Sequence, residues 1–329
     1  MKSRGLTMKD IAAKAGVSIT TVSHVINKTR HVNQETQDAV LKAMNDLHYT
    51  GRTSRKSGKI KYVGVIIADV REDYYISIIK AIETTATDFG ISVLFCDSED
   101  DPEKEERNIH MVLDSKVSGI ILAPIQTDHI PRSLKSASIP VVLIDRQYEN
   151  HSYLFVGINN FASAYAATGH LIDKGCKRIG FVGYSETVYT IRQRTLGYRA
   201  RIMEREDLNS PAVLALSYHK EDSYPRIKQF IETESLDGLI CATSTVCYEV
   251  VSVLDGIDNA GKDPVRIVSY DDNRWFDYVK YPISVILQPT AEIGSSALEN
   301  LLQLIEQADS GTDIKRELFF DTSIIDRLN

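Results

Sequence analysis

The sequence predicts a small all-α head followed by an α/β body of two doubly wound lobes, each built on a parallel sheet. Three observations indicate this fold. The chain has 329 residues, which is too long for one ordinary domain. Short helical patterns broken by a glycine occupy residues 1–49, whereas apolar, strand-like runs alternate with helical stretches beyond residue 61. Hydrophobic residues make up 43% and charged residues 25%, as in ordinary globular domains, which excludes disordered and fibrous classes.

The chain carries no sign of a membrane or metal protein. No run approaches the ~20 apolar residues that a membrane-spanning helix needs. The first residues are charged and have no apolar segment behind them, so we expect no secretory signal and a cytoplasmic location. Cys96, Cys176, Cys241 and Cys247 form no C-x-x-C pair and have mostly apolar neighbours, which predicts buried free thiols, no metal site and no cofactor.

Residues 1–49 read as three short helices. The first follows the capping-box-like Thr7 and ends at Gly16, a residue type that closes helices. The second, over 19–27, is capped by Ser18. The third follows the cap Asn33 and is expected to bury Val40, Leu41, Met44 and Leu47. Two helices joined by a short glycine-containing turn form a helix-turn-helix, whose second helix enters the major groove of DNA.

Charge is divided unevenly along the chain. Residues 1–61 carry twelve Lys or Arg and four Asp or Glu, a net charge of +8, whereas the remainder carries −15, which together give −7. A basic head on an acidic body indicates that only one end of the chain meets a polyanion. The second helix of the head has hydroxyls and an imidazole on its outer face and no acidic side chain, which also favours DNA.

The head resembles the headpiece of the LacI/GalR family. The resemblance rests on T-M-K-D-I-A at 7–12 and A-G-V-S-I-T-T-V-S-H-V-I-N at 15–27. Within that family, residues 20–30 are particularly similar to the purine-repressor headpiece. It implies base reading by Ile19, Thr20 and His24 and phosphate contacts by Thr7, Ser18, Thr21, Ser23, Asn27 and His31. Hydroxyls and amides suit phosphate oxygens, and such contacts set register rather than sequence.

Residues 50–61 form a linker with two glycines and five basic residues. In the resembling family this stretch forms a hinge helix on DNA, with a Pro-Asn start and a leucine wedge. Here a glycine and Arg52 stand at the Pro-Asn positions, and Gly58 stands at the leucine. Two alternatives stay open: a hinge that meets phosphates through Arg52, Arg55 and Lys56, or a tether disordered with and without DNA.

The body, residues 62–329, alternates strands and helices. Helical stretches such as 76–89 and 162–174 separate apolar runs. Continuous Val/Ile/Leu runs flanked by helices predict parallel sheets covered on both faces, and ten strands suggest two sheets. Ligands of such folds bind at the carboxyl ends of the strands. The predicted strands are 62–68, 92–96, 119–123, 140–145, 154–158, 178–182, 212–216, 238–242, 266–269 and 284–287.

The family resemblance extends over the body. G-V-I-I-A-D at 64–69, I-P-V-V-L-I-D-R at 139–146 and Y-D-D at 270–272 fall in family order. They imply a periplasmic-binding-protein-like effector sensor with three chain crossings between two lobes, and a homodimer that binds a palindromic operator. The implied domains are 1–49, 50–61 and 62–329, with lobe 1 at about 62–160 and 290–322 and lobe 2 at about 161–289 and 323–329.

The same resemblance implies seven effector-binding residues: Tyr74, Tyr75, Arg146, Thr190, Arg194, Tyr218 and Asp271. Tyrosine faces stack on sugars or bases, arginine supplies paired donors, and aspartate accepts from hydroxyls. Three alternatives stay open. The tyrosines could be ordinary aromatics at a helix start, Asp271 could accept local backbone hydrogen bonds, and Arg194 could form a surface ion pair.

Departures from the family bear on ligand charge. Asn159 and residues 243–244 stand where the family often carries acids. With Arg146, Arg192 and Arg194 close by, this pattern favours an acidic ligand such as a uronate, a sugar phosphate or a phosphoprotein.

The predicted function is therefore a DNA-binding repressor whose operator affinity a small ligand, a sugar or sugar derivative, modulates. The alternative is a global or activating regulator of the same family, controlled by a protein partner or a purine-type corepressor. An enzyme is disfavoured, because the chain has no P-loop, no G-x-G-x-x-G, no G-x-S-x-G and no H-E-x-x-H motif. A solute receptor would need an export signal.

Overall fold

The computed structural model of the chain describes residues 8–18, 21–22, 25, 32–47, 61–149, 152–217, 222–257, 264–307 and 317–328. The chain divides into two units, Met1–Lys59 and Ile60–Asn329, which we call the head and the body. Across the described residues, no helix combines the length and the hydropathy that crossing a bilayer requires.

The first turn of the head follows the prediction. Helix α1, Met8–Ala15, ends at Gly16, whose φ of +68° is a left-handed conformation that glycine adopts without steric cost. The Oγ of Ser18 then accepts the backbone N–H of Thr21 at 3.0 Å, the geometry of a helix N-cap. The end of the first helix and the cap of the second are thus both confirmed.

The third helix of the head, α3, spans Gln34–Asp46. Its predicted cap is confirmed, because Asn33 Oδ1 accepts the N–H of Thr36 at 2.8 Å. The prediction for Leu41 was wrong, since this side chain is 50% exposed: it follows Val40 directly and points about 100° away around the helix. The described core of the head consists of Ile11, Ala12, Val22, Val40 and Ala43.

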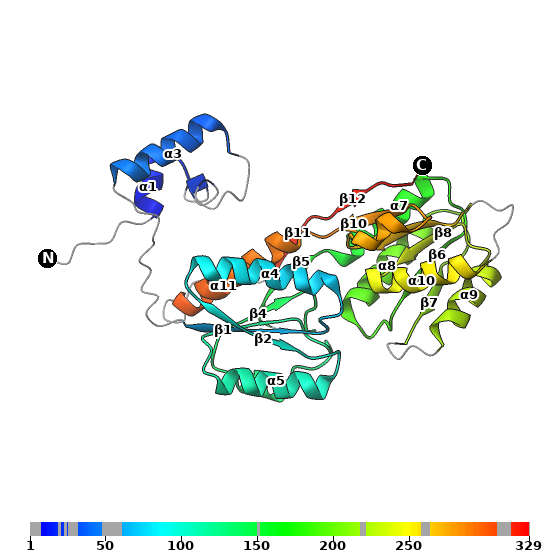
Figure 1. Cartoon of the computed structure of the whole chain (residues 1–329), viewed down its shortest axis with the longest axis horizontal. Helices are drawn as coiled ribbons and strands as arrows, with labels where there is room; N and C mark the ends of the chain where they lie inside the picture. Colours follow the sequence, from blue (N-terminus) through cyan, green and yellow to red (C-terminus); the bar gives the residue numbers. More distant parts are fainter. Residues whose placement is uncertain are drawn as a thin grey trace. The chain divides into compact units, whose positions relative to one another are not determined.

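Lobe 1 of the body contains a six-stranded parallel sheet of order β11-β5-β4-β3-β1-β2. Its strands are β1 Tyr62–Ile67, β2 Ser92–Asp97, β3 Ile120–Leu122, β4 Val141–Ile144, β5 Leu154–Ile158 and β11 Glu317–Phe320. Its helices are α4 Asp73–Asp88, α5 Pro102–Asp114, α6 Arg132–Ser136 and α11 Thr290–Gln307. Figure 1 shows α4 and α11 on one face of this sheet and α5 on the other.

Lobe 2 contains the second six-stranded sheet, of order β12-β10-β9-β8-β6-β7. Its strands are β6 Ile179–Gly183, β7 Ala212–Ala215, β8 Gly238–Cys241, β9 Arg266–Tyr270, β10 Ile283–Leu287 and β12 Ser323–Ile325. Its helices are α7 Asn160–Asp173, α8 Tyr189–Met203, α9 Ser223–Glu234, α10 Ser244–Gly256 and the 3-10 helix η1 Arg274–Tyr278. The strands are parallel except β12, which runs antiparallel to β10.

All ten predicted strands are present, whereas β11 and β12 were not predicted. Both are short edge strands without a fully buried residue, and their apolar runs have only three and two residues. The chain passes between the lobes after β5, after β10 and after β11, which gives the three crossings that the resemblance implied.

Two glycines let helix α8 pack closely on α7 and helix α11 pack closely on α4. A Cβ on Gly197 of α8 would lie 2.2 Å from the carbonyl oxygen of Phe161 in α7. A Cβ on Gly294 of α11 would lie 2.6 Å from the carbonyl oxygen of Ile78 in α4. Because the N-terminal ends of α8 and α4 carry residues of the candidate site, these close contacts help to fix its position.

Candidate functional site

The carboxyl ends of strands from both lobes meet at a small cavity, which we call the inner niche. Lobe 1 lines it with Glu72, Tyr74, Tyr75, Asp145 and Arg146. Lobe 2 and the crossing into α11 line it with Val188, Thr190, Ile191, Arg194, Thr243, Asp271 and Gln288. The cavity volume is about 40 Å³, which is room for about one water molecule at the roughly 30 Å³ that a water takes up in the liquid.

Two aspartates of the niche stand directly after central strands in an uncommon backbone conformation. Asp145 follows β4 with φ of 61°, and Asp271 follows β9 with φ of 62°. Side chains other than glycine rarely adopt this left-handed region, and Asp is among the few that tolerate it. Such residues concentrate at functional sites, where the surrounding structure holds them.

The lobe 1 wall is a chain of polar contacts around Asp145. The hydroxyl of Tyr75 donates to Asp145 Oδ2 at 2.7 Å, and burial raises the pKa of Tyr75, so this hydroxyl stays a donor. Arg146 lies between two carboxylates: its Nη1 donates to Asp100 Oδ1 at 3.1 Å, and its Nε lies 3.5 Å from Asp145 Oδ2. The Arg146 charge is therefore neutralised within lobe 1.

Arg194 of lobe 2 is buried and held by neutral partners. Its Nε donates to Asn160 Oδ1 at 2.8 Å and its Nη1 donates to the carbonyl of Ala242. Its guanidinium carbon lies 3.5 Å from the centroid of the Tyr270 ring. Within the described part of the chain no carboxylate lies at ion-pair distance, so the surface ion-pair alternative was wrong.

Asp271 and Gln288 form the third group of the niche. Gln288 Nε2 donates to both carboxylate oxygens of Asp271, at 2.9 and 3.1 Å. Burial raises the pKa of Asp271 to about 6, although the charge of Arg194 opposes this shift. Gln288 Oε1 is buried without a hydrogen-bond partner among the described residues, which leaves an acceptor available to a ligand hydroxyl or a water.

Glu72 adds a carboxyl that sequence reasoning missed. It precedes α4 in lobe 1 and forms a side-chain hydrogen bond with Thr245 of lobe 2. Its pKa is raised to about 7, chiefly by burial and in smaller part by the nearby negative charge of Asp271. Three further polar pairs join the lobes: Asn273 with Asp73, Gln147 with Tyr189, and Arg192 with Glu149.

A larger cavity, the outer chamber, adjoins the inner niche and shares Arg146 and Val188 with it. Its volume is about 450 Å³. Lobe 1 lines it with Asp100, Pro102, Ile125, Gln126, Thr127 and Asp128, and lobe 2 with Ser185, Thr187 and Arg192.

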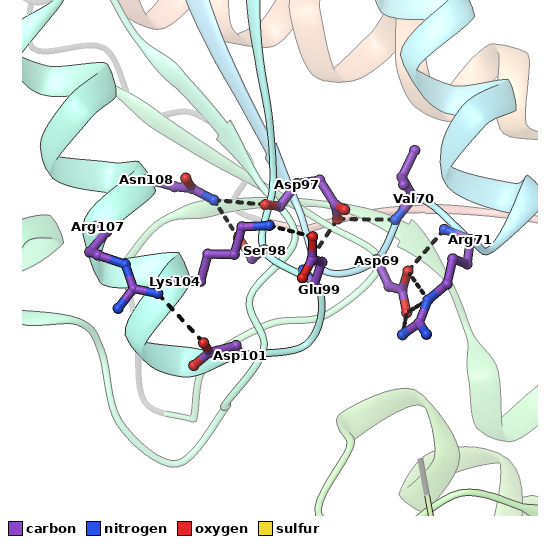
Figure 2. A network of polar contacts seen from close by, with 10 residues as sticks. All are labelled: Asp69, Val70, Arg71, Asp97, Ser98, Glu99, Asp101, Lys104, Arg107 and Asn108. Carbon is purple, nitrogen blue, oxygen red and sulfur yellow. Dashed lines mark hydrogen bonds and ion pairs between the residues drawn. The ribbon is translucent and has the colours of Figure 1, made fainter. Parts of the chain in front are cut away.

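Figure 2 shows the polar network that holds the lobe 1 loops beside these cavities. Asp97, at the end of β2, accepts the backbone N–H of Val70 at 3.1 Å and that of Glu99 at 3.3 Å. Asn108 of α5 donates to the Asp97 carbonyl at 3.0 Å and to Ser98 Oγ at 3.1 Å. The loop after β2, which carries Asp100, is thus tied both to the loop after β1 and to α5.

Comparison with known proteins covers both units of the chain. Residues 7–51 match the model described as bacterial regulatory proteins, lacI family, and residues 63–309 match the periplasmic binding protein domain. The HTH-type transcriptional repressor PurR of Mannheimia succiniciproducens is 30% identical over 92% of this chain and 93% of its own length. The chain belongs to the LacI family. The resemblance drawn from the head and the body is therefore confirmed.

Other relatives extend the comparison. The ribose operon repressor of Halalkalibacterium halodurans is 26% identical over 92% of this chain and 91% of its own. Among solved structures, the regulator CelR in complex with cellobiose has a TM-score of 0.70 at 21% identity, over 98% of this chain and 99% of that one. The lac repressor bound to ONPG has a TM-score of 0.69 at 20% identity, over 98% and 99%. These structures show that the fold is shared.

The structure brings six of the seven predicted effector residues of this LacI-family chain together: Tyr74, Tyr75, Arg146, Thr190, Arg194 and Asp271 all line the inner niche. Tyr218 lies outside the described residues, as do Ile19, Thr20, His24, Thr7, Ser23, Asn27, His31, Arg52, Arg55 and Lys56. Ser18 and Thr21 are described, and their hydroxyl oxygens lie 2.7 Å apart.

Four further residues line the niche that were not predicted to bind the effector: Glu72, Asp145, Thr243 and Gln288. Asp145 and Thr243 stand within two residues of the ends of strands β4 and β8, so the rule that ligands bind at strand ends could have found them. The same rule applies to Gln288, which directly follows strand β10, whereas Glu72 lies five residues beyond the end of β1 and had no such signal.

The expectation of an acidic ligand rested on three arginines, and two of them are already paired, whereas Arg194 has no carboxylate at ion-pair distance within the described part of the chain. Arg146 is paired with Asp100 and Asp145, and Arg192 is paired with Glu149 at 2.8 Å. The sequence places arginines near the cleft but does not show which carboxylates neutralise them. An anionic ligand would have to displace these pairs.

Proposed function

We propose that this chain is a transcriptional repressor that binds a palindromic operator as a homodimer and senses a sugar or sugar derivative between the two lobes of its body. Membership of the LacI family supports DNA binding by the head. The relatives include a ribose operon repressor and a regulator solved with cellobiose, which supports the sugar class.

One observation carries the effector half of this proposal. The niche presents hydrogen-bond acceptors on both walls: Asp145 on the lobe 1 wall, and Asp271 and Gln288 on the opposite wall. The opposite wall also supplies the donors, Thr190 and Arg194. Closely spaced donors and acceptors of this kind suit a molecule with several hydroxyls. Because the walls belong to different lobes, a ligand that contacts both walls favours one arrangement of the lobes over others.

Ligand binding and DNA binding are coupled if a change in the arrangement of the two lobes also changes the relative position of the two heads of a dimer. Such couplings are typically about 1–3 kcal/mol, and linkage requires the operator to change ligand affinity by the same factor. The chain is proposed to act by binding alone, with no chemical step.

The test uses the purified full-length chain. Its palindromic operator is selected from random DNA, and operator affinity is then measured by fluorescence anisotropy with and without neutral sugars, acidic sugars, sugar phosphates and purines. A ligand at about 100 times its Kd should add roughly 2.7 kcal/mol to thermal stability, which identifies it independently of DNA.

We expect a neutral sugar both to stabilise the body and to change operator affinity. Stabilisation by a purine alone would favour a purine-type corepressor. No selection of a palindrome would contradict the DNA-binding half of the proposal, whatever the ligand result.

A further inference from the structure

The outer chamber contains only Arg146 of the described effector residues that the family resemblance implied, yet it is much larger than the inner niche. Its 450 Å³ lies within the range of cavities that hold small molecules, roughly 300–1,000 Å³, whereas the niche offers about 40 Å³. The niche is too small for a sugar ring in this arrangement of the lobes. It can take only the polar end of a ligand.

We propose that the effector is an uncharged glycoside larger than one hexose, with its polar end in the inner niche and its remaining unit in the outer chamber. The inference rests on the proposed sugar-sensing function and narrows it. The two cavities share Arg146 and Val188, so one ligand can pass between these side chains from the niche into the chamber.

The size of the chamber supports a second unit. At the volume that one water takes up in the liquid, about 30 Å³, the chamber corresponds to about fifteen waters. A hexose has fewer non-hydrogen atoms than that, and bonded atoms lie closer together than separate waters do. A single ring would therefore leave much of the chamber to solvent.

The charges of the chamber support a neutral unit. Its two arginines in the described part of the chain are already neutralised, Arg146 by Asp100 at 3.1 Å and Arg192 by Glu149 at 2.8 Å. Its remaining charged residue, Asp128, has a side chain that is 85% exposed. A phosphate or carboxylate here would have to break an ion pair, whereas a neutral unit leaves both intact.

The chamber walls also fit the two faces of a sugar. Pro102, Ile125 and Val188 supply apolar surface, and Gln126, Thr127 and Thr187 supply an amide and hydroxyls. A pyranose has an apolar C–H face and a rim of hydroxyls, which match these two kinds of side chain. The loop that carries Asp100 is fixed by the network of Asp97 and Asn108 (Figure 2), so the lobe 1 wall is preformed.

The experiment is isothermal titration calorimetry on the full-length chain with matched sugars. The probes are glucose with cellobiose and maltose, galactose with lactose and melibiose, and glucose 6-phosphate and glucuronate as charged arms. Thr187→Trp fills the chamber from lobe 2 at an exposed position, and Gln126→Trp does so from lobe 1. Thr233→Trp, exposed on α9 and outside both cavities, is the matched control.

We expect at least one neutral disaccharide to bind about tenfold or more tightly than its monosaccharide. Thr187→Trp should remove that advantage and leave monosaccharide affinity nearly unchanged, while Thr233→Trp changes neither. Gln126→Trp gives the same readout if the first variant does not fold.

Three outcomes would overturn the inference: monosaccharides that bind as tightly as their disaccharides, a charged sugar as the tightest ligand, or chamber variants that leave the disaccharide advantage intact. In these cases the sugar-sensing function still stands. If none of the sugars binds, the sugar-sensing function fails together with the inference.

Discussion

The head and the body of this chain are stabilised on very different scales. The described core of the head consists of five side chains, whereas the body encloses two larger clusters that cover both faces of its sheets. The charges differ as well, with +8 in residues 1–61 and −15 in the remainder. A small basic unit suits a surface that DNA can help to order, and a large acidic unit suits a cavity that must keep its shape without a ligand.

The largest expected effect comes from matched truncations in the two cores. Ile11→Ala in the head and Ile82→Ala in the body each remove a fully buried isoleucine, at a cost of about 2–5 kcal/mol. The head has little stability to spare, so Ile11→Ala should unfold it and abolish operator binding. Ile82→Ala should lower the melting temperature of the body and leave the head folded.

Differential scanning calorimetry and operator binding by anisotropy check this pair. An Ile11→Ala chain that still binds its operator with normal affinity would show that the head is not marginally stable. The proposed difference in stability between head and body would then be wrong.

The next effect concerns Glu72, a partly buried acid beside the inner niche of the body. Burial raises the pKa of Glu72 to about 7 from an ordinary 4.5. The folded state therefore binds this proton more tightly than the unfolded state, so stability is greatest below about pH 4.5 and falls as pH rises to about 7. The loss reaches at most about 3 kcal/mol. Glu72→Gln should remove this part of the pH dependence.

The measurement is the urea unfolding free energy of the body transition from pH 5 to 8 in both proteins. Glu105, whose pKa burial also raises to about 7, stays in both and cancels in the difference. Parallel pH profiles for the two proteins would refute the assignment to Glu72.

In the head, His24→Ala tests base reading. If this side chain contacts a base edge, the substitution should weaken operator binding by about 1–3 kcal/mol and relax the preference at one base position. Selection of binding sites from random DNA with both proteins checks this. An unchanged preference at every position would remove His24 from the base-reading set.

The smallest effect on sequence preference is expected in the linker. Arg55→Ala with Lys56→Ala should lower affinity equally for all DNA sequences and reduce the slope of log affinity against log salt by about 2. Titrations at several salt concentrations, on the operator and on random DNA, check this. A loss of specificity without a loss of affinity would mean that the linker reads bases.

Much of the fold could be predicted because central parallel strands are continuous apolar runs, and all ten such runs form strands. The helix caps could be predicted equally well, because Gly16, Ser18 and Asn33 end or cap helices through contacts with residues close to them in the sequence. The strands β11 and β12 have apolar runs of only three and two residues, and neither contains a fully buried residue. Apolar runs therefore identify the eight central strands and the edge strands β2 and β7, and they miss the two edge strands whose apolar runs are shortest.

The candidate site was only partly predictable. Six side chains that the family resemblance implied do line one niche. Their pairing could not be predicted, because it depends on contacts between distant segments, such as Arg146 with Asp100, which stand 46 residues apart. The expectation of an acidic ligand stays a prediction, and the ion pairs of Arg146 and Arg192 weigh against it: the sequence shows that charges are present, and only the fold shows which of them are already neutralised.

The left-handed backbone of Asp145 and Asp271 limits which substitutions could change the ligand specificity of this body for use as a biosensor. At φ near +60° asparagine and glycine fit, whereas bulky or β-branched residues are strained. A library that randomises these two positions would mostly yield damaged proteins. Exposed chamber positions such as Gln126 and Thr187 tolerate wider substitution, so new specificities are best sought there, with the two aspartates kept as fixed anchors.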